Sequence, residues 1–288
     1  MLKSMLAALA VLLLASPALA RPAGHPMLPR PPVHGRPIVI GQSYTVRSHV
    51  LNQTRTINVW LPATYGQKGK TFPVLYLLDG GVQYEDFQHI AGLAHLGGIV
   101  GQFREMIVIG IAGIDRKHDF TSPSSDPAEV RDFPTTGGSA AFRRFLGSEL
   151  EPWVQRHFKG DGERVLMGES LAGLFVTETF LRDPTLFDDY IAISPSLWWD
   201  KQTLSKDAAG LLATHPAGKR KLYLSIASEG STMQAGVDRI VTALKTKAPE
   251  GLAWRYEPMP GETHATIYHP AALAAFRALM AQPPEAKK

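Results

Sequence analysis

One serine of this chain stands in a setting that could make it a nucleophile. The stretch "VLMGESLAGLF" at residues 165–175 places Ser170 between two small residues, Gly168 and Ala172. Small residues at these positions let a strand turn so sharply into a helix that the serine oxygen stands clear of the sheet. Glycine is more usual where Ala172 stands, so the stretch departs from the common pattern at one position. We predict that Ser170 is a nucleophile at a strand-to-helix turn.

A histidine is needed as the base, because a serine attacks readily only when its proton is removed. His264 and His269 both lie in "PGETHATIYHP", which follows the last predicted strand. His264 lies in a loop with glycine and threonine, whereas His269 adjoins Pro270 at the start of a predicted helix. We therefore predict that His264 is the base.

An acid usually orients such a histidine and comes between the serine and the histidine along the chain. Glu229 follows the apolar run "LYLSIA" directly, while Asp238 lies in the next predicted helix. We favour Glu229 as the acid. Asp238, or a serine and histidine pair without an acid, remains an alternative.

The developing oxyanion requires two amide donors that point to one place. The amide of Leu171 is brought there by the turn itself, because Leu171 follows Ser170 at the start of a helix. The second donor is expected in "DGG", where Gly80 and Gly81 would allow the backbone to approach a ligand closely. A plain tight turn would explain the same two glycines.

Short apolar runs separate these residues and predict the sheet that must position them. Runs that are apolar throughout are typical of parallel strands buried on both faces, whereas alternating segments indicate antiparallel strands with one wet face. Residues 43–50 and 55–62 alternate and predict an antiparallel hairpin. The continuous runs are residues 73–79, 105–111, 164–168, 190–194, 222–227 and 254–259.

Helical patterns lie between the predicted strands. One begins near Ser139 as its N-cap and places apolar residues at steps of three and four as far as Phe158, and a last helix starts at Pro270. Alternating strands and helices predict an α/β fold with a doubly wound, mostly parallel sheet and antiparallel N-terminal strands. Chemistry in such sheets lies at the carboxyl ends of the strands. Residues 115–138 show no structure of their own, as expected of a binding loop or a disordered insert.

Composition restricts the class of protein. Apolar residues make up 44% and charged residues 19% of the 288 residues, which indicates a globular protein. The formal charge is +4, but no dense Lys/Arg stripe with interleaved aromatic residues is present, so we expect no nucleic-acid partner. The absence of cysteine excludes disulfides and thiolate metal sites.

The amino-terminal residues predict export. Residues 1–20 have an early lysine, an apolar run and a small-residue ending at Ala20, which is typical of a cleaved signal peptide. Residues 21–42 are rich in proline and predict an extended leader. We expect a single domain over residues 43–282, a disordered tail over residues 283–288, no stable membrane insertion and a periplasmic or secreted location.

Five motifs in order resemble those of the putative esterase family of α/β hydrolases. They are "RTINVWLPATY", "FPVLYLLDGG", "GESLAGLF", "ISPSLWW" and "GETHATIYHP", and the resemblance covers residues 43–280. The family includes esterase D-like enzymes, feruloyl esterases, mycolyltransferases and hydrolases of trilactone siderophores such as enterobactin, and the motifs look most like those of the last group. The resemblance implies the α/β-hydrolase fold.

The resemblance also implies roles for individual residues. Ser170 and His264 would be the nucleophile and base, and Leu171 and Gly81 would give the oxyanion amides. "GIDRKHDFTSP" is similar to a family loop that would bring Arg116 to the mouth of the site. "SPSLWW" would bring Trp198 and Trp199 close to the substrate.

We therefore predict an exported serine esterase that forms an acyl-enzyme from a small-molecule ester, with a siderophore trilactone favoured as the substrate. No metal and no organic cofactor is implied, and the oligomeric state stays open. A feruloyl or acetyl esterase and an acyltransferase are alternatives within the same fold. A binding protein that has lost catalysis is the alternative of another class, favoured only by Ala172 and the uncertain acid.

Overall fold

The computed structural model describes residues 35–282. The predicted signal peptide, most of the predicted proline-rich leader and the predicted tail lie outside the described residues. Residues 35–39 are exposed and have no regular secondary structure, and from Ile40 onward the described residues form one compact unit. Within residues 35–282, no helix has both the length and the apolar character needed to cross a membrane.

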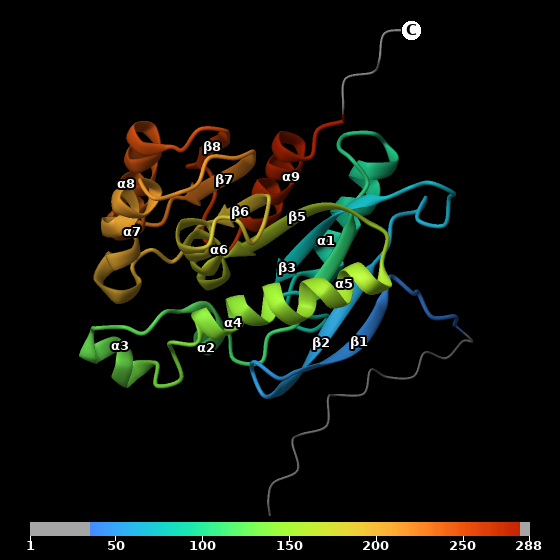
Figure 1. Ribbon diagram of the computed structural model, residues 1–288, viewed down its shortest axis with the longest axis horizontal. Coiled ribbons are helices and arrows are strands. Elements are labelled where there is room, and N and C mark those ends of the chain that lie inside the picture. Colours follow the sequence, from blue (N-terminus) through green and yellow to red (C-terminus); the bar gives the residue numbers. More distant parts are fainter. Residues whose placement is uncertain (1–34, 283–288) are drawn as a thin grey trace, which may run out of the picture. The chain divides into compact units, whose positions relative to one another are not determined.

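An eight-stranded sheet is the centre of this unit (Figure 1). Its spatial order is β1-β2-β4-β3-β5-β6-β7-β8. β1 pairs with β2 and β2 with β4 in antiparallel fashion, and all other neighbours are parallel. The strands are β1 (Gln42–Ser48), β2 (Gln53–Trp60), β3 (Phe72–Leu78), β4 (Ile107–Ile111), β5 (Gly160–Glu169), β6 (Asp189–Ile193), β7 (Arg220–Ala227) and β8 (Leu252–Met259).

The apolar runs explain why the sheet is buried at its centre. Every residue of β3, β4 and β6 is buried, as parallel strands covered on both faces require. Each predicted strand has a counterpart in the sheet. The prediction of an α/β-hydrolase fold, with a mostly parallel doubly wound sheet and antiparallel N-terminal strands, is confirmed.

Helices cover both faces of the sheet and enclose two hydrophobic cores (Figure 1). Side chains of α4 to α8 pack on the face that carries Tyr76 and Leu78, and α1 and α9 pack on the face that carries Leu75 and Leu77. The helical elements are α1 (Phe87–Ile99), α2 (Arg116–Phe120), α3 (Pro127–Asp132), α4 (Ser139–Phe145), the π-helical turn η1 (Leu146–Leu150), α5 (Glu151–His157), α6 (Leu171–Arg182), α7 (Trp199–Leu212), α8 (Ser231–Lys247) and α9 (Tyr268–Leu279).

The long helix predicted from Ser139 is interrupted. The N-cap is Gly138 instead of Ser139, and η1 separates α4 from α5. Pro152 lies in the first turn of α5. Because proline has no amide hydrogen, the regular hydrogen-bond ladder cannot continue through this position, and a π-helical turn accommodates the break. The last helix begins at Tyr268, two residues before Pro270.

Residues 115–138 contain two short helices that we did not predict. The carboxylate of Asp115 accepts from the amide of His118 at the start of α2, and that of Asp126 accepts from the amide of Ala128 at the start of α3. Side-chain caps of this kind satisfy amides that a short helix leaves without partners. The segment is therefore structured by local capping, which apolar periodicity does not reveal.

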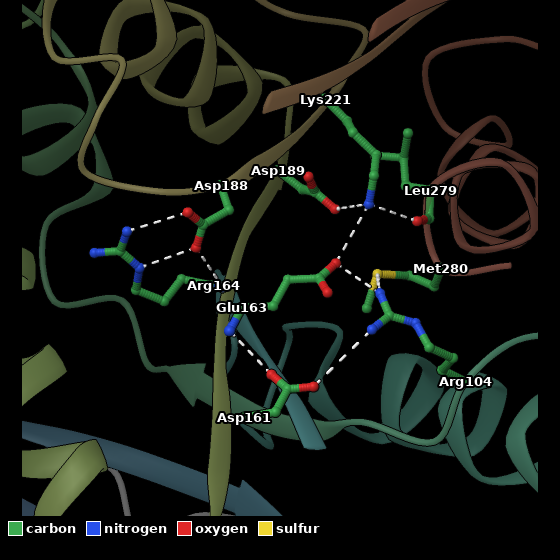
Figure 2. A network of polar contacts seen from close by, with 9 residues as sticks. All are labelled: Arg104, Asp161, Glu163, Arg164, Asp188, Asp189, Lys221, Leu279 and Met280. Carbon is green, nitrogen blue, oxygen red and sulfur yellow. Dashed lines mark hydrogen bonds and ion pairs between the residues drawn. The ribbon is translucent and has the colours of Figure 1, made fainter. Parts of the chain in front are cut away.

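An ion-pair network joins the amino ends of β5, β6 and β7 (Figure 2). The Nζ atom of Lys221 lies 2.8 Å from Asp189 Oδ2 and 3.3 Å from Glu163 Oε1, and it donates to the carbonyl of Leu279 at 3.0 Å. Arg104 binds the same Glu163 carboxylate at 2.6 Å. Burial raises the pKa of Asp189, and the hydrogen bond from Lys221 acts against that rise. The network therefore depends on Lys221 to neutralise a buried carboxylate.

Lys221→Met should lower the free energy of unfolding by about 2–4 kcal/mol, because Asp189 would keep a buried charge without its partner. Lys219→Met is the matched control, since Lys219 is exposed and lies directly before the first residue of β7. Urea unfolding of both variants measures the difference. Adding Asp189→Asn to the first variant should recover part of the loss, and equal losses in the two lysine variants would contradict this account.

Candidate active site

The turn between β5 and α6 holds Ser170 in a strained conformation. Its φ and ψ angles are 61° and −120°, a region that residues with a side chain rarely adopt. Two backbone hydrogen bonds of 3.0 Å fix the turn against β6 and the residues after it, from the Ser170 amide to Ile193 and from the Ser196 amide to Ser170. The structure thus presents the serine side chain at the carboxyl end of a central strand.

Close packing explains why this turn needs small residues. A Cβ atom at Gly168 would lie 2.7 Å from the Cβ atom of Ala172, and one at Gly173 would lie 2.6 Å from the carbonyl oxygen of Ile193. Ala172 is fully buried and packs against Gly168. The usual glycine can be replaced at Ala172 because the facing residue has no side chain.

Three side chains from three loops form a hydrogen-bonded chain. His264 Nε2 lies 2.9 Å from Ser170 Oγ, and His264 Nδ1 lies 2.9 Å from Glu229 Oε2. Ser194 donates to the other oxygen of Glu229. With the proton on Nδ1, His264 donates to Glu229 and accepts from Ser170 at Nε2. This arrangement can remove a proton from the serine oxygen.

The carboxylates around His264 raise the pKa of its imidazole. Burial alone would raise the pKa of Glu229, but hydrogen bonds from His264 and Ser194 hold it below its ordinary value. The hydrogen bond to Glu229 raises the pKa of His264, burial opposes this rise, and the Glu169 carboxylate adds to it. Glu229 is therefore an anion that stabilises the protonated imidazole.

A second carboxyl group adjoins the same histidine. Glu169 Oε1 lies 3.3 Å from His264 Nε2, the nitrogen that also faces Ser170. Burial raises the pKa of Glu169 to about 7, against the opposing charges of His264 and Arg116. Glu169 therefore changes its charge close to neutral pH.

The two predicted oxyanion donors differ in their surroundings. Leu171 is the first residue of α6, so its amide has no partner within the helix. The Gly81 amide donates to Glu85 Oε2, and the Gly113 amide donates to Glu85 Oε1 at 3.1 Å. A Cβ atom at Gly80 would lie 2.4 Å from the Cα atom of Gly110, so Gly80 is needed for close strand packing. The Gly81 amide can face a substrate only after the Glu85 carboxylate leaves it.

A cavity of about 460 Å³ opens above the hydrogen-bonded chain. Its walls combine polar groups with the apolar side chains of Leu171, Trp198 and Met233. Arg116 also faces the cavity, and its Nη2 atom lies 2.8 Å from Asp79 Oδ2. The lining residues are Arg116, Ser170, Leu171, Ser196, Trp198, Ser228, Glu229, Met233 and His264.

Some of the predicted site residues lie elsewhere. Trp199 is 4% exposed and donates from its indole nitrogen to the carbonyl of Ser122, so it packs in the core instead of lining the cavity. Asp238 lies within α8, and its carboxylate accepts from Gln234 at 2.8 Å. His269 Nε2 lies 3.2 Å from Asp86 Oδ1 at the start of α9. Neither alternative residue contacts Ser170 or His264 among the described hydrogen bonds and ion pairs.

Sequence reasoning missed several groups of this site. Glu169 is the residue directly before Ser170, and an acid inside the turn motif was a signal that could have identified it. Ser194 directly follows β6 at the carboxyl edge of the sheet, where functional residues are expected. Glu85 and Met233 had no such signal, because Glu85 lies in the loop after β3 and Met233 in the first turn of α8, and neither belongs to a motif.

Comparisons with known proteins identify related chains. Residues 48–268 match the family model described as putative esterase. The chain is 25% identical over 241 residues to the ferri-bacillibactin esterase BesA of Bacillus subtilis, covering 75% of this chain and 82% of that protein. It is 26% identical over 171 residues to a siderophore enterobactin esterase of Emericella nidulans, covering 53% and 56% of the two chains.

Solved structures are similar as well. The crystal structure of an IroE-like serine hydrolase from Shewanella oneidensis superimposes with a TM-score of 0.76 at 27% sequence identity. The match covers 83% of this chain and 80% of that chain.

Glu169→Gln should stabilise the folded protein at alkaline pH. The pKa of Glu169 is raised from 4.5 to about 7 in the folded state, so this group costs no stability below pH 4.5 and an increasing amount as the pH rises from 4.5 to 7. Glutamine carries no charge, so the variant should exceed the unmodified chain by about 1–3 kcal/mol at pH 8 and show little difference at pH 4.5. Urea unfolding at both pH values measures this.

The exposed Glu250 provides the control, because Glu250→Gln leaves the site untouched. The account would be wrong if Glu169→Gln destabilised the protein equally at both pH values.

Proposed function

The chain belongs to the putative esterase family, and from this premise we propose that it is an exported serine esterase of siderophores that works through an acyl-enzyme. Ester hydrolysis itself follows from the family and from the similar siderophore esterases. The observation that carries the proposed mechanism is the chain of 2.9 Å contacts from Ser170 through His264 to Glu229 beside an open cavity.

His264 acts as the base in the first step of the proposed reaction. Its Nε2 atom takes the proton of Ser170 Oγ as that oxygen attacks the ester carbonyl, and Glu229 stabilises the imidazolium that forms. His264 then returns the proton to the leaving alcohol, and the acyl group stays on Ser170. Water, deprotonated by the same histidine, releases the acid and restores the serine.

The carbonyl oxygen becomes negative in both steps and needs donors. The amide of Leu171, at the start of α6, is the proposed first donor. The amide of Gly81 is the proposed second donor, and it becomes free when the Glu85 carboxylate moves or is replaced by the substrate oxygen. The Glu85 oxygen on this amide supports the proposal, because it shows that an oxygen acceptor fits at this position.

The wall of the cavity supports an aromatic ester as the substrate. Trp198 and Met233 offer apolar surface on the side of Ser170, and Arg116 offers a cation at the mouth. A triscatechol trilactone combines aromatic rings, acidic hydroxyls and ester bonds, which these three groups would bind. The names of the similar bacillibactin and enterobactin esterases support the same substrate class.

Two alternatives use the same chemistry. A feruloyl or acetyl esterase would place a smaller ester in the same cavity, and an acyltransferase would capture the acyl group with a sugar hydroxyl. The signal-like residues 1–20 support export, which would place any of these activities outside the cytoplasm.

Ser170→Ala should reduce kcat/KM for a triscatechol trilactone by about 10⁴-fold to 10⁶-fold, because the nucleophile and base act as a unit. Rates on the trilactone, methyl ferulate and a short p-nitrophenyl ester, measured with the same preparation, test the substrate class. The trilactone should be the best of the three substrates.

A fluorophosphonate probe provides an independent test of the nucleophile. Mass spectrometry should find the adduct on Ser170 and none in the alanine variant. Activity that survives in Ser170→Ala would overturn the mechanism, whereas activity on methyl ferulate without activity on the trilactone would overturn only the substrate.

The acidic limb of the pH–rate profile should report the pKa of His264. Only the neutral imidazole can accept the serine proton, so kcat/KM falls as the pH drops through the pKa of His264, which lies above 6.5. Glu229→Gln should shift this limb to lower pH and reduce the maximal rate by about 10²-fold to 10⁴-fold. Asp238→Asn is the control, and an unshifted limb in Glu229→Gln would assign the acid elsewhere.

A further inference from the structure

Three potential metal ligands meet outside the cavity, between the start of α1 and the start of α9. Asp86 Oδ1 lies 3.0 Å from His89 Nδ1 and 3.2 Å from His269 Nε2. One donor atom from each residue lies within 4.8 Å of the other two. Asp86 and His89 share a helix face because they are three residues apart, and His269 arrives from the far end of the chain.

Two of the three separations between these donor atoms fit a first-row metal ion, and the third, between the two imidazoles, is no more than 4.8 Å. Ligand bonds of about 2.0–2.2 Å place neighbouring donors about 3.0 Å apart in octahedral and about 3.4 Å apart in tetrahedral coordination. The two measured separations of 3.0 and 3.2 Å lie within this range. The two imidazole rings are not stacked: their planes are inclined by 72°, with centroids 4.6 Å apart. Because the rings are not stacked, each can direct a nitrogen towards the same ion.

The Asp86 carboxylate does not cap the helix that follows it. Asp86 is the N-cap residue of α1, yet its side chain accepts no capping hydrogen bond from the helix. Aspartate is favoured at this position because such a bond stabilises the helix. Here one carboxylate oxygen faces two imidazole nitrogens, as it would when all three bind one cation.

We propose that Asp86, His89 and His269 form a binding site for a divalent transition metal ion of the Zn²⁺ class. Two imidazoles and one carboxylate suit zinc and its neighbours, whereas Mg²⁺ and Ca²⁺ prefer oxygen ligands alone. Water completes the coordination, because the site offers three protein ligands. The ion joins α1 to α9, and it takes no part in the proposed ester hydrolysis.

The residues around the three ligands affect how strongly the metal ion binds and which loop it holds. Both helices begin at the site, and their partial positive charges weaken cation binding, so the single carboxylate of Asp86 is essential. The open side of the site adjoins a groove of about 380 Å³ between the two helices, lined in part by His89, Leu93 and His269. The Asp86 amide also donates to the carbonyl of Asp79, so the ion tethers the loop that carries Gly81 and Glu85.

Zinc binding to the untagged full chain, stripped with EDTA, tests this site. Isothermal titration with ZnCl₂ should show one equivalent bound, MgCl₂ should show none, and saturating zinc should raise the unfolding temperature by about 3–6 °C. His269→Ala and Asp86→Asn should each weaken zinc binding at least tenfold. Both positions lie at the surface, and circular dichroism confirms folding of each variant.

His49→Ala is the matched control, because His49 is exposed and lies apart from the three ligands. It should bind zinc like the unmodified chain. Unchanged stoichiometry and affinity in His269→Ala, or no zinc binding by the unmodified chain, would overturn the proposal. Esterase activity need not change in either case, so this result is independent of the proposed reaction.

Discussion

The close contact between the turn after β5 and the end of β6 is the constraint on which the site depends. The backbone of Ser170 adopts angles that cost about 1–3 kcal/mol, and it persists because the surrounding structure fixes both sides of the turn. The Ser170 amide binds the carbonyl of Ile193, and that same carbonyl leaves no room for a side chain at Gly173. A bulkier residue at Gly173 or Gly168 would separate the helix from the sheet. The serine oxygen would then no longer meet His264.

The two edges of the sheet differ in how their acidic groups are paired with cations. At the amino edge, Lys221 and Arg104 bind the carboxylates of Asp189 and Glu163, so charge is largely paired (Figure 2). At the carboxyl edge, burial raises the pKa values of several acids, among them Asp79, Glu85 and Glu169. Acids that are costly to ionise destabilise a protein above their usual pKa values. The carboxyl edge therefore gives up stability at the place where the reacting groups gather. At the amino edge burial also raises the pKa of Asp189, but there the hydrogen bond from Lys221 opposes the rise.

Patterns along the chain were sufficient to predict the sheet and the order of the main site residues. Apolar runs locate strands, and the carboxyl ends of parallel neighbours meet at one edge, so residues that follow β5, β7 and β8 must lie close together. This reasoning placed Ser170, Glu229 and His264 in one region, and the structure brings them into hydrogen-bond contact. Their roles in catalysis remain a proposal.

Contacts that depend on loop conformation could not be predicted. Trp198 and Trp199 are adjacent in the sequence, but only Trp198 faces the cavity, because the indole of Trp199 is held by the carbonyl of Ser122. Arg116 was expected at the mouth of the site, but its ion pair there with Asp79, from the loop after β3, had no signal in the sequence. That pairing leaves Arg116 with part of its charge neutralised. An anionic substrate must compete with Asp79 for the guanidinium, so aromatic contact with Trp198 should contribute more to substrate recognition than charge does.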